Sequence, residues 1–181
     1  MSNGPRVILT TERLVVREMV VSPGHQAGLD DAAFILELLN DPSFIRNIGD
    51  RNVRTLDAAR SYITNGPVAS YERFGFGLWL VELTDRTPVG MCGLLKRDVL
   101  EDVDIGFAYL PAYQSKGYGF EAAHAVLDYA RDVLRLPRIV AIVNADNDAS
   151  ARLLEKLGMT FERMVQPFPA EPPLKLFGLT P

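Results

Sequence analysis

The segment VDIGFAYLPAYQSKGYGFEAAHAVLDYARDVLRLPRIVAIV, residues Val103–Val143, decides the fold of this chain. It begins with a predicted strand over Val103–Leu110, whose side chains alternate between two faces. An amphipathic helix is predicted next. Its apolar side chains recur at three- and four-residue steps and are Ala123, Val126, Leu127, Ala130, Val133 and Leu134. Pro137 should end this helix, and the β-branched run Arg138–Val143 is typical of a strand buried on both faces. A strand, helix and strand at this spacing form a βαβ unit, so the two strands should be parallel.

The remaining segments predict more strands and shorter helices. Predicted strands cover Val7–Leu9, Leu14–Glu18, Phe76–Leu83, Val89–Lys96, Met159–Val165 and Leu174–Leu179, with a hairpin turn at Thr84–Pro88 and a loop over Val20–Leu29. Predicted helices cover Ala32–Leu39, Leu56 to about Asn65, and Ser150–Leu157. The fold class is therefore α+β: a central, mostly antiparallel, mixed sheet with one βαβ crossover, flanked by helices.

The helix ends carry their own signals. Asp30 or Asp31 should cap the helix Ala32–Leu39, and Asn40-Asp41-Pro42 should end it. Thr55 should cap the next helix. Gly66-Pro67 is expected to break that helix, because proline lacks the N–H donor that a helix interior needs.

Composition narrows the class of protein. The 181 residues, 48% hydrophobic and 23% charged, fit one domain over residues 1–181 with residues 1–5 as a loose end. A net charge of −4 without a basic run argues against nucleic-acid binding, and no apolar run approaches the roughly 20 residues of a membrane-spanning helix.

A single cysteine, Cys92, does not call for an oxidising compartment, so we expect a cytoplasmic protein. His25, His124 and Cys92 lack metal-site spacing, so no metal is predicted. The oligomeric state stays open between monomer and homodimer.

The turn Gln114–Gly119 carries the chemistry. The first N–H groups of a helix have no partner inside it and lie at the positive end of its dipole. Gly117 and Gly119 let the backbone approach a ligand, and Lys116 adds a positive charge. This arrangement predicts a site for a pyrophosphate, although a turn that only reverses the chain has the same residues. Neither G-x-x-x-x-G-K-[ST] nor G-x-G-x-x-G occurs, so Walker-type and Rossmann nucleotide sites are not expected.

Several segments together resemble the GCN5-related N-acetyltransferases (GNAT), and within them the RimJ/RimL-like branch that acetylates ribosomal-protein N-termini. Similar segments are Thr10–Arg17, Asp104–Phe107, Gln114–Gly119, Asn147–Ser150, Leu153–Met159 and Leu174–Leu179. They follow in the family's order and spacing and cover nearly the whole chain. This joint match is far more specific than any one motif.

The resemblance implies acetyl-coenzyme A as the acetyl donor and an amine as the acceptor, either a small molecule or a protein N-terminus. It implies that the pyrophosphate binds to the residues Gln114, Ser115, Lys116, Gly117, Tyr118, Gly119 and Phe120. The backbone of Phe107, Ala108 and Tyr109 would pair with the pantetheine arm, and Asn147 would contact that arm from the other side. The acceptor groove should involve residues 44–75 and 165–173.

The resemblance also implies direct attack by the amine in a ternary complex. Many family members use a tyrosine as the acid, but Leu154 stands at that position here. We therefore predict that Ser150 is the partner of the leaving thiolate, although both Asn147 and Ser150 could instead simply cap the short helix that starts there. Asp104 is the candidate base, acting through water, unless it is an ordinary exposed acid on a strand, and Asp102 is the second candidate. A non-catalytic coenzyme-A-binding sensor or regulatory module is the alternative function.

Overall fold

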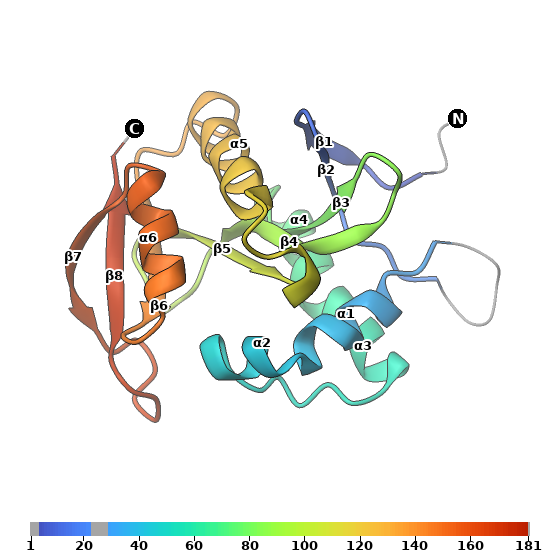
Figure 1. Cartoon of the computed structure of the whole chain (residues 1–181), viewed down its shortest axis with the longest axis horizontal. Helices are drawn as coiled ribbons and strands as arrows, with labels where there is room; N and C mark the ends of the chain where they lie inside the picture. The colour runs from blue at the N-terminus through green and yellow to red at the C-terminus, as the bar shows by residue number, and fades with distance from the viewer. Residues whose placement is uncertain (1–3, 23–28, 181) are drawn as a thin grey trace.

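The computed structural model describes residues 4–22 and 29–180 and contains one eight-stranded mixed sheet (Figure 1). The strands are β1 (Val7–Thr10), β2 (Leu14–Arg17), β3 (Leu78–Leu83), β4 (Pro88–Leu95), β5 (Val103–Tyr109), β6 (Ile139–Asn144), β7 (Thr160–Val165) and β8 (Leu174–Leu179). Their order across the sheet is β1-β2-β3-β4-β5-β6-β8-β7. Neighbouring strands are antiparallel except β5 and β6, which are parallel. The predicted fold class and the parallel pair of the βαβ unit are confirmed.

Six α-helices of the described residues flank the sheet in two groups. They are α1 (Ala32–Asn40), α2 (Pro42–Asn47), α3 (Leu56–Ile63), α4 (Ala69–Phe74), α5 (Tyr118–Asp132) and α6 (Asp148–Lys156). Figure 1 shows α5 and α6 together on one side of the strands, with α1, α2 and α3 on the other. The βαβ helix α5 therefore lies away from the layer formed by the N-terminal helices.

Two hydrophobic cores form because side chains alternate along each strand. Trp79 and Val81 of β3 belong to the core under α5 and α6, whereas Leu80 between them belongs to the core under α1 and α3. The same split occurs on β5, where Ile105 belongs to the first core and Ala108 to the second. The sheet is thus covered on both faces, as the apolar strand β6 predicted.

Two helix boundaries differ from the sequence prediction. Asn40-Asp41-Pro42 does end α1, but it also starts α2, because the Asp41 carboxylate accepts a hydrogen bond from the Ser43 N–H at 2.8 Å. Pro42 occupies the start of α2, where a missing N–H costs nothing. The predicted break at Gly66-Pro67 is wrong. The chain passes from α3 through a π-helical turn, Thr64–Val68, directly into α4, and Pro67 is buried in this turn. Packing of this segment against the sheet overrides the local preference of proline.

Of the two predicted caps of α1, Asp30 bonds the helix start and Asp31 belongs to a buried ionic triad. The side chain of Asp31 makes no cap hydrogen bond; Asp30 instead accepts from the Ala32 N–H at 3.0 Å. The Arg17 guanidinium donates to both Asp31 oxygens at 2.9 Å and to Glu82 Oε2 at 2.9 Å. All three side chains are at most 5% exposed. The triad therefore ties the start of α1 to β2 and β3.

We expect Arg17→Ala to destabilise the fold strongly. Removing the guanidinium leaves the buried Asp31 carboxylate without a counter-ion and leaves Glu82 with only the exposed Arg86, which should cost about 3–5 kcal/mol in the free energy of unfolding. Urea denaturation at pH 7 measures this. The matched control is Arg86→Ala, since Arg86 bonds the same Glu82 at 3.2 Å but is 67% exposed, and should cost less than about 1 kcal/mol. Equal, small losses for the two variants would contradict a structural role for the triad.

Candidate active site

The site begins where β5 and β6 separate. These strands pair only at Val103–Ile139 and Asp104–Val140. Beyond Asp104, β5 remains paired with β4 as far as Tyr109, and β6 with β8 as far as Asn144. A cavity of about 1730 Å³ opens there, lined by the diverging halves of both strands. The sheet thus contains an internal edge that no strand covers.

The direction of the β5 backbone decides which groups face this cavity. The Leu110 N–H donates to the Val89 oxygen of the β4 side at 3.1 Å. Because main-chain groups of alternate residues in a strand point to the same side, those of Ala108 also face β4. The N–H and C=O groups of Phe107 and Tyr109 point toward the cavity, where the Gln114 amide donates to the Tyr109 carbonyl at 2.9 Å. The cavity edge therefore offers the main-chain N–H and C=O groups of Phe107 and the main-chain N–H of Tyr109, while Ala108 contributes its side chain.

The glycine turn lies at the end of β5 and opens α5. Ser115 and Gly117 adopt positive φ values of 58° and 83°, and Gly117 is the N-cap of α5 without a side-chain cap bond. The first main-chain bond into the helix runs from Glu121 N to Gly117 O, 3.0 Å. In the described part of the chain, the N–H groups of residues 115–120 have no hydrogen-bond partner. These amides form a set of donors at the positive end of a 15-residue helix.

A clamp from the loop between β1 and β2 holds the turn in place. Glu121 accepts hydrogen bonds from the Thr11 hydroxyl at 2.5 Å and from Arg13 Nε at 2.7 Å. Arg13 also donates to the Lys116 carbonyl at 3.0 Å and lies 4.6 Å from the centre of the Tyr118 ring. Burial alone would raise the pKa of Glu121, but the hydrogen bonds from Thr11 and Arg13 outweigh it and hold that pKa below its usual range. The clamp therefore stays ionised.

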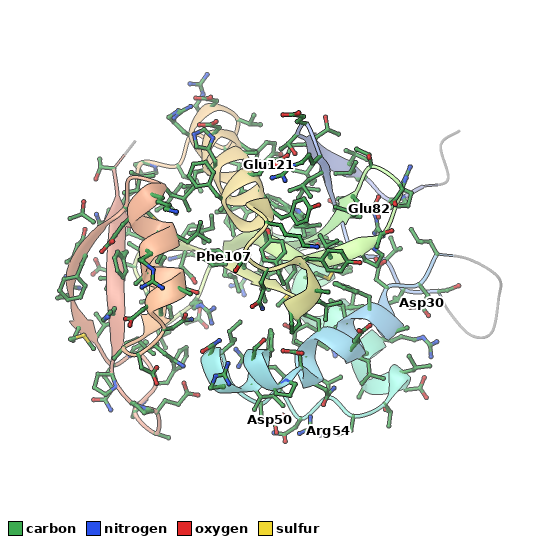
Figure 2. The ribbon with its side chains drawn as sticks, viewed as in Figure 1. Asp30, Asp50, Arg54, Glu82, Phe107 and Glu121 are labelled. Atoms are coloured by element: carbon green, nitrogen blue, oxygen red, sulfur yellow. The ribbon has the colours of Figure 1, made fainter. Side chains whose placement is uncertain are left out.

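This clamp was not predicted from the sequence. Thr11 and Arg13 belong to the segment Thr10–Arg17, which served only as part of the family resemblance, and 108 positions separate Arg13 from Glu121. An acidic residue in the first turn of α5 was the only local signal. Figure 2 shows Glu121 on α5 and Phe107 near the middle of the view, between α6 and the start of α5.

The other wall of the cavity is the start of α6. The Asn147 side chain caps this helix by accepting a hydrogen bond from the Ser150 N–H at 3.2 Å. Both residues line the cavity, and the Ser150 hydroxyl has no partner among the described residues. Leu154, one turn further along, is fully buried in the core. Ser150 is thus the hydroxyl that α6 presents to the cavity.

Asp104 lies at the last paired position before the strands part. It is 1% exposed, so it is not an ordinary exposed acid on a strand. Arg97 Nε donates to its two oxygens at 3.0 and 3.2 Å. Burial raises the pKa of Asp104 above its usual value, and the charge of Arg97 opposes this rise only in part. A carboxylate with a raised pKa beside a cavity is suited to accepting a proton during a reaction.

The structure brings most of the predicted site residues to one cavity. Those that line it are Asp104, Phe107, Ala108, Tyr109, Gln114, Ser115, Gly117, Gly119, Phe120, Asn147 and Ser150. Lys116 and Tyr118 do not line it. Lys116 is exposed with its ammonium 5.8 Å from the centre of the Tyr113 ring, and Tyr118 packs under Arg13.

His124, which the sequence did not assign to the site, also lines the cavity. His124 is an exposed residue on α5, 3.2 Å from the Asp128 carboxylate, and His25 lies outside the described residues. Cys92 is fully buried, and burial raises the pKa of its thiol. Within residues 4–22 and 29–180, no group of three or more His, Cys, Asp or Glu side chains could hold a metal ion. No helix in those ranges is long and apolar enough to cross a membrane.

Comparison with known proteins gives this site its family. The sequence pattern of the family described as "Acetyltransferase (GNAT) domain" matches residues 25–160. The chain belongs to the GNAT acetyltransferase family. It is therefore an N-acetyltransferase, an acyltransferase that acts on amino groups, and its family uses acetyl-coenzyme A as the donor. The predicted family is confirmed, while the RimJ/RimL-like branch stays a prediction.

Relatives and solved structures agree with this family. The uncharacterized N-acetyltransferase YnaD of Bacillus subtilis is 27% identical over 154 residues, which are 85% of this chain and 83% of YnaD. The acetyltransferase from Agrobacterium tumefaciens str. C58 has a TM-score of 0.78 at 22% identity, over 96% of this chain and 94% of that one. A spermidine N-acetyltransferase from Vibrio cholerae, solved in complex with CoA and spermine, has a TM-score of 0.73 at 18% identity, over 94% and 96%. At these identities the two structures establish a shared fold.

Proposed function

We propose that this GNAT chain, as one domain over residues 1–181, moves the acetyl group of acetyl-coenzyme A to a primary amine in the cytoplasm. The observation that carries the proposal is the uncovered β5 edge, which ends at the open amides of residues 115–120. In this proposal the coenzyme diphosphate accepts hydrogen bonds from those amides. The pantetheine arm lies along β5 as an added strand, bonded to Phe107 and the Tyr109 N–H, with Asn147 on the opposite wall.

The reaction then needs no covalent enzyme intermediate. A main-chain N–H of β5 polarises the thioester carbonyl, as an oxyanion donor does. The neutral amine attacks the carbonyl carbon, a C–N bond forms, and the C–S bond breaks. Asp104 takes the proton of the attacking amine through water, and the Ser150 hydroxyl donates a proton or hydrogen bond to the leaving thiolate. The products are an acetamide and free coenzyme A.

The direct experiment is release of free thiol from acetyl-coenzyme A with a panel of primary amines. Turnover with at least one amine supports the proposal. Tight coenzyme binding without turnover on any amine would favour the alternative of a coenzyme-A-binding sensor or regulatory module. Failure of coenzyme A to bind in calorimetry would remove both.

Gly117→Ala should weaken coenzyme binding. Gly117 has a φ of 83°, which an L-residue adopts at a cost of about 1–2 kcal/mol. A methyl group there would also lie 3.2 Å from Arg13 Nη2, within the clamp. We expect a roughly tenfold increase in the Kd for coenzyme A, equivalent to about 1.4 kcal/mol, measured by titration calorimetry.

Gly75→Ala is the matched control for this variant. Gly75 has a φ of 77° at the end of α4, and a methyl group there would meet no atom within 4 Å. It does not line the cavity, so it should lose comparable stability but retain its coenzyme affinity. If the two variants changed the affinity for coenzyme A equally, the glycine turn would have no specific role in coenzyme binding.

Asp104→Asn should change how the rate depends on pH. If Asp104 accepts the amine's proton, activity falls as the pH drops through its raised pKa, so the acid limb of kcat lies above the ordinary aspartate range. Asparagine cannot accept the proton, so kcat should fall about a hundredfold and this limb should disappear. The control is Asp102→Asn, since Asp102 bonds Arg138 at 3.0 Å outside the cavity. An unchanged acid limb in Asp104→Asn would exclude the base role.

Ser150→Ala tests the partner of the leaving thiolate. Its main-chain N–H still bonds Asn147, so α6 should keep its cap and the protein its melting temperature. We expect kcat to fall roughly tenfold or more, with little change in the Kd for coenzyme A, because the hydroxyl acts on the thiolate that develops during the reaction. An unchanged kcat would assign Ser150 to the helix start alone.

A further inference from the structure

The cavity extends past the coenzyme cleft to a second end with its own charges. This end is lined by Asn47 of α2, Arg51, Tyr62 of α3, Arg97 and Asp104. We propose that this end recognises a carboxylate, so that the acceptor is a primary amine that also carries a carboxylate, as free amino acids do. The inference rests on the proposed function and specifies the class of amine.

Arg51 is the side chain that points to an anion. It lines the cavity, and within the described residues it has no ion pair or hydrogen bond. Its neighbour Arg54, which does not line the cavity, is bound to Asp50 at 2.5 Å and to Asn40 at 2.8 Å. The guanidinium of Arg51 therefore keeps its full donor capacity for a ligand, and a guanidinium fits a carboxylate in a two-pronged geometry.

Tyr62 and Arg97 place further donors at the same end. Burial raises the pKa of Tyr62, and the charges of Arg51 and Arg97 oppose this rise, so both guanidinium groups lie near its phenol. The Tyr62 hydroxyl has no hydrogen-bond partner within the described chain and stays a neutral donor. Arg97 binds Asp104 through Nε, and its two terminal nitrogens have no partner in residues 4–22 and 29–180.

The charges that line the cavity favour a molecule that carries both a positive and a negative group. Asp104 is neutralised by Arg97, whereas Arg51 and Glu171 line the cavity without an ion pair among the described residues. The other lining charges without an ion pair there, Glu12, Arg152 and Lys156, come from the loop between β1 and β2 and from α6. Glu171 comes from the connection between β7 and β8 and can attract an ammonium group, while Arg51 attracts a carboxylate. A polyamine, which carries only positive charge, would place a cation against Arg51. The arrangement therefore matches an amino acid better than a polyamine.

The experiment compares each standard amino acid with its α-carboxamide, with spermidine and 1,4-diaminobutane as polyamines. Each amide keeps the amine and side chain but loses the carboxylate, and it also resembles a peptide N-terminus. We expect at least one amino acid to exceed its amide, and both polyamines, by about tenfold or more in kcat/KM. The proposal would be overturned if the amides or the polyamines equalled or exceeded every amino acid in kcat/KM.

Arg51→Glu identifies the residue responsible. It should lower kcat/KM for the preferred amino acid about tenfold or more and should not lower the value for its amide, which has no carboxylate to lose. Arg46→Glu is the control, because Arg46 is exposed on neighbouring α2 and does not line the cavity. Equal losses for acid and amide in Arg51→Glu, or equal effects of the two variants, would contradict the assignment.

A binding measurement separates this inference from the proposed function. If no amine supports thiol release, the proposed function fails, and the carboxylate site is then judged by calorimetry with glutarate and 1,5-diaminopentane in the presence of coenzyme A. Glutarate should bind more tightly than the diamine, and Arg51→Glu should remove this preference. A preference for the diamine, or no loss in Arg51→Glu, would overturn the inference.

Discussion

The separation of β5 from β6 after Asp104 is the constraint on which the rest of this structure depends. Two residue pairs join the strands, and each strand is then held by its other neighbour, β4 or β8. Main-chain donors and acceptors without partners cost free energy in a protein interior, so an internal edge is stable only where water or a ligand reaches it. The cavity supplies that access. A feature that would be a defect in a closed sheet is here an edge at which an extended molecule can pair.

Both walls of the cavity are fixed by contacts within the protein. On one side, the Asn144 amide donates to the Asn47 carbonyl at 2.8 Å, which joins the end of β6 to α2. The layer that contains α2 is itself anchored by the Arg17 triad, which joins the start of α1 to β2 and β3. On the other side, Glu121 joins the start of α5 to the loop between β1 and β2. The gap therefore does not depend on a ligand to hold it open.

The features that the sequence predicted are local ones. The βαβ unit and the glycine turn each depend on residues close together in the chain, where periodicity and helix-end chemistry act directly. The clamp on Glu121 and the Arg17 triad join residues tens of positions apart, and no local pattern specifies such partners. Asp104 combines a feature that the sequence predicts with one that it does not. Its place on a strand was predictable, but its burial depends on Arg97 and on the helices that cover that face.

The alternation of side chains on β5 also separates the two substrates in space. Val103 and Ile105 face the core beneath α5 and α6, so Asp104 between them faces the opposite side, toward the layer of α1 and α3. The glycine turn opens α5 on the first side, while Tyr62 belongs to α3 on the second. A coenzyme held by the turn and an acceptor held near Tyr62 would therefore enter from different faces of the sheet and meet in the gap between β5 and β6. Binding of one substrate then leaves the path of the other open, as direct transfer in a ternary complex requires.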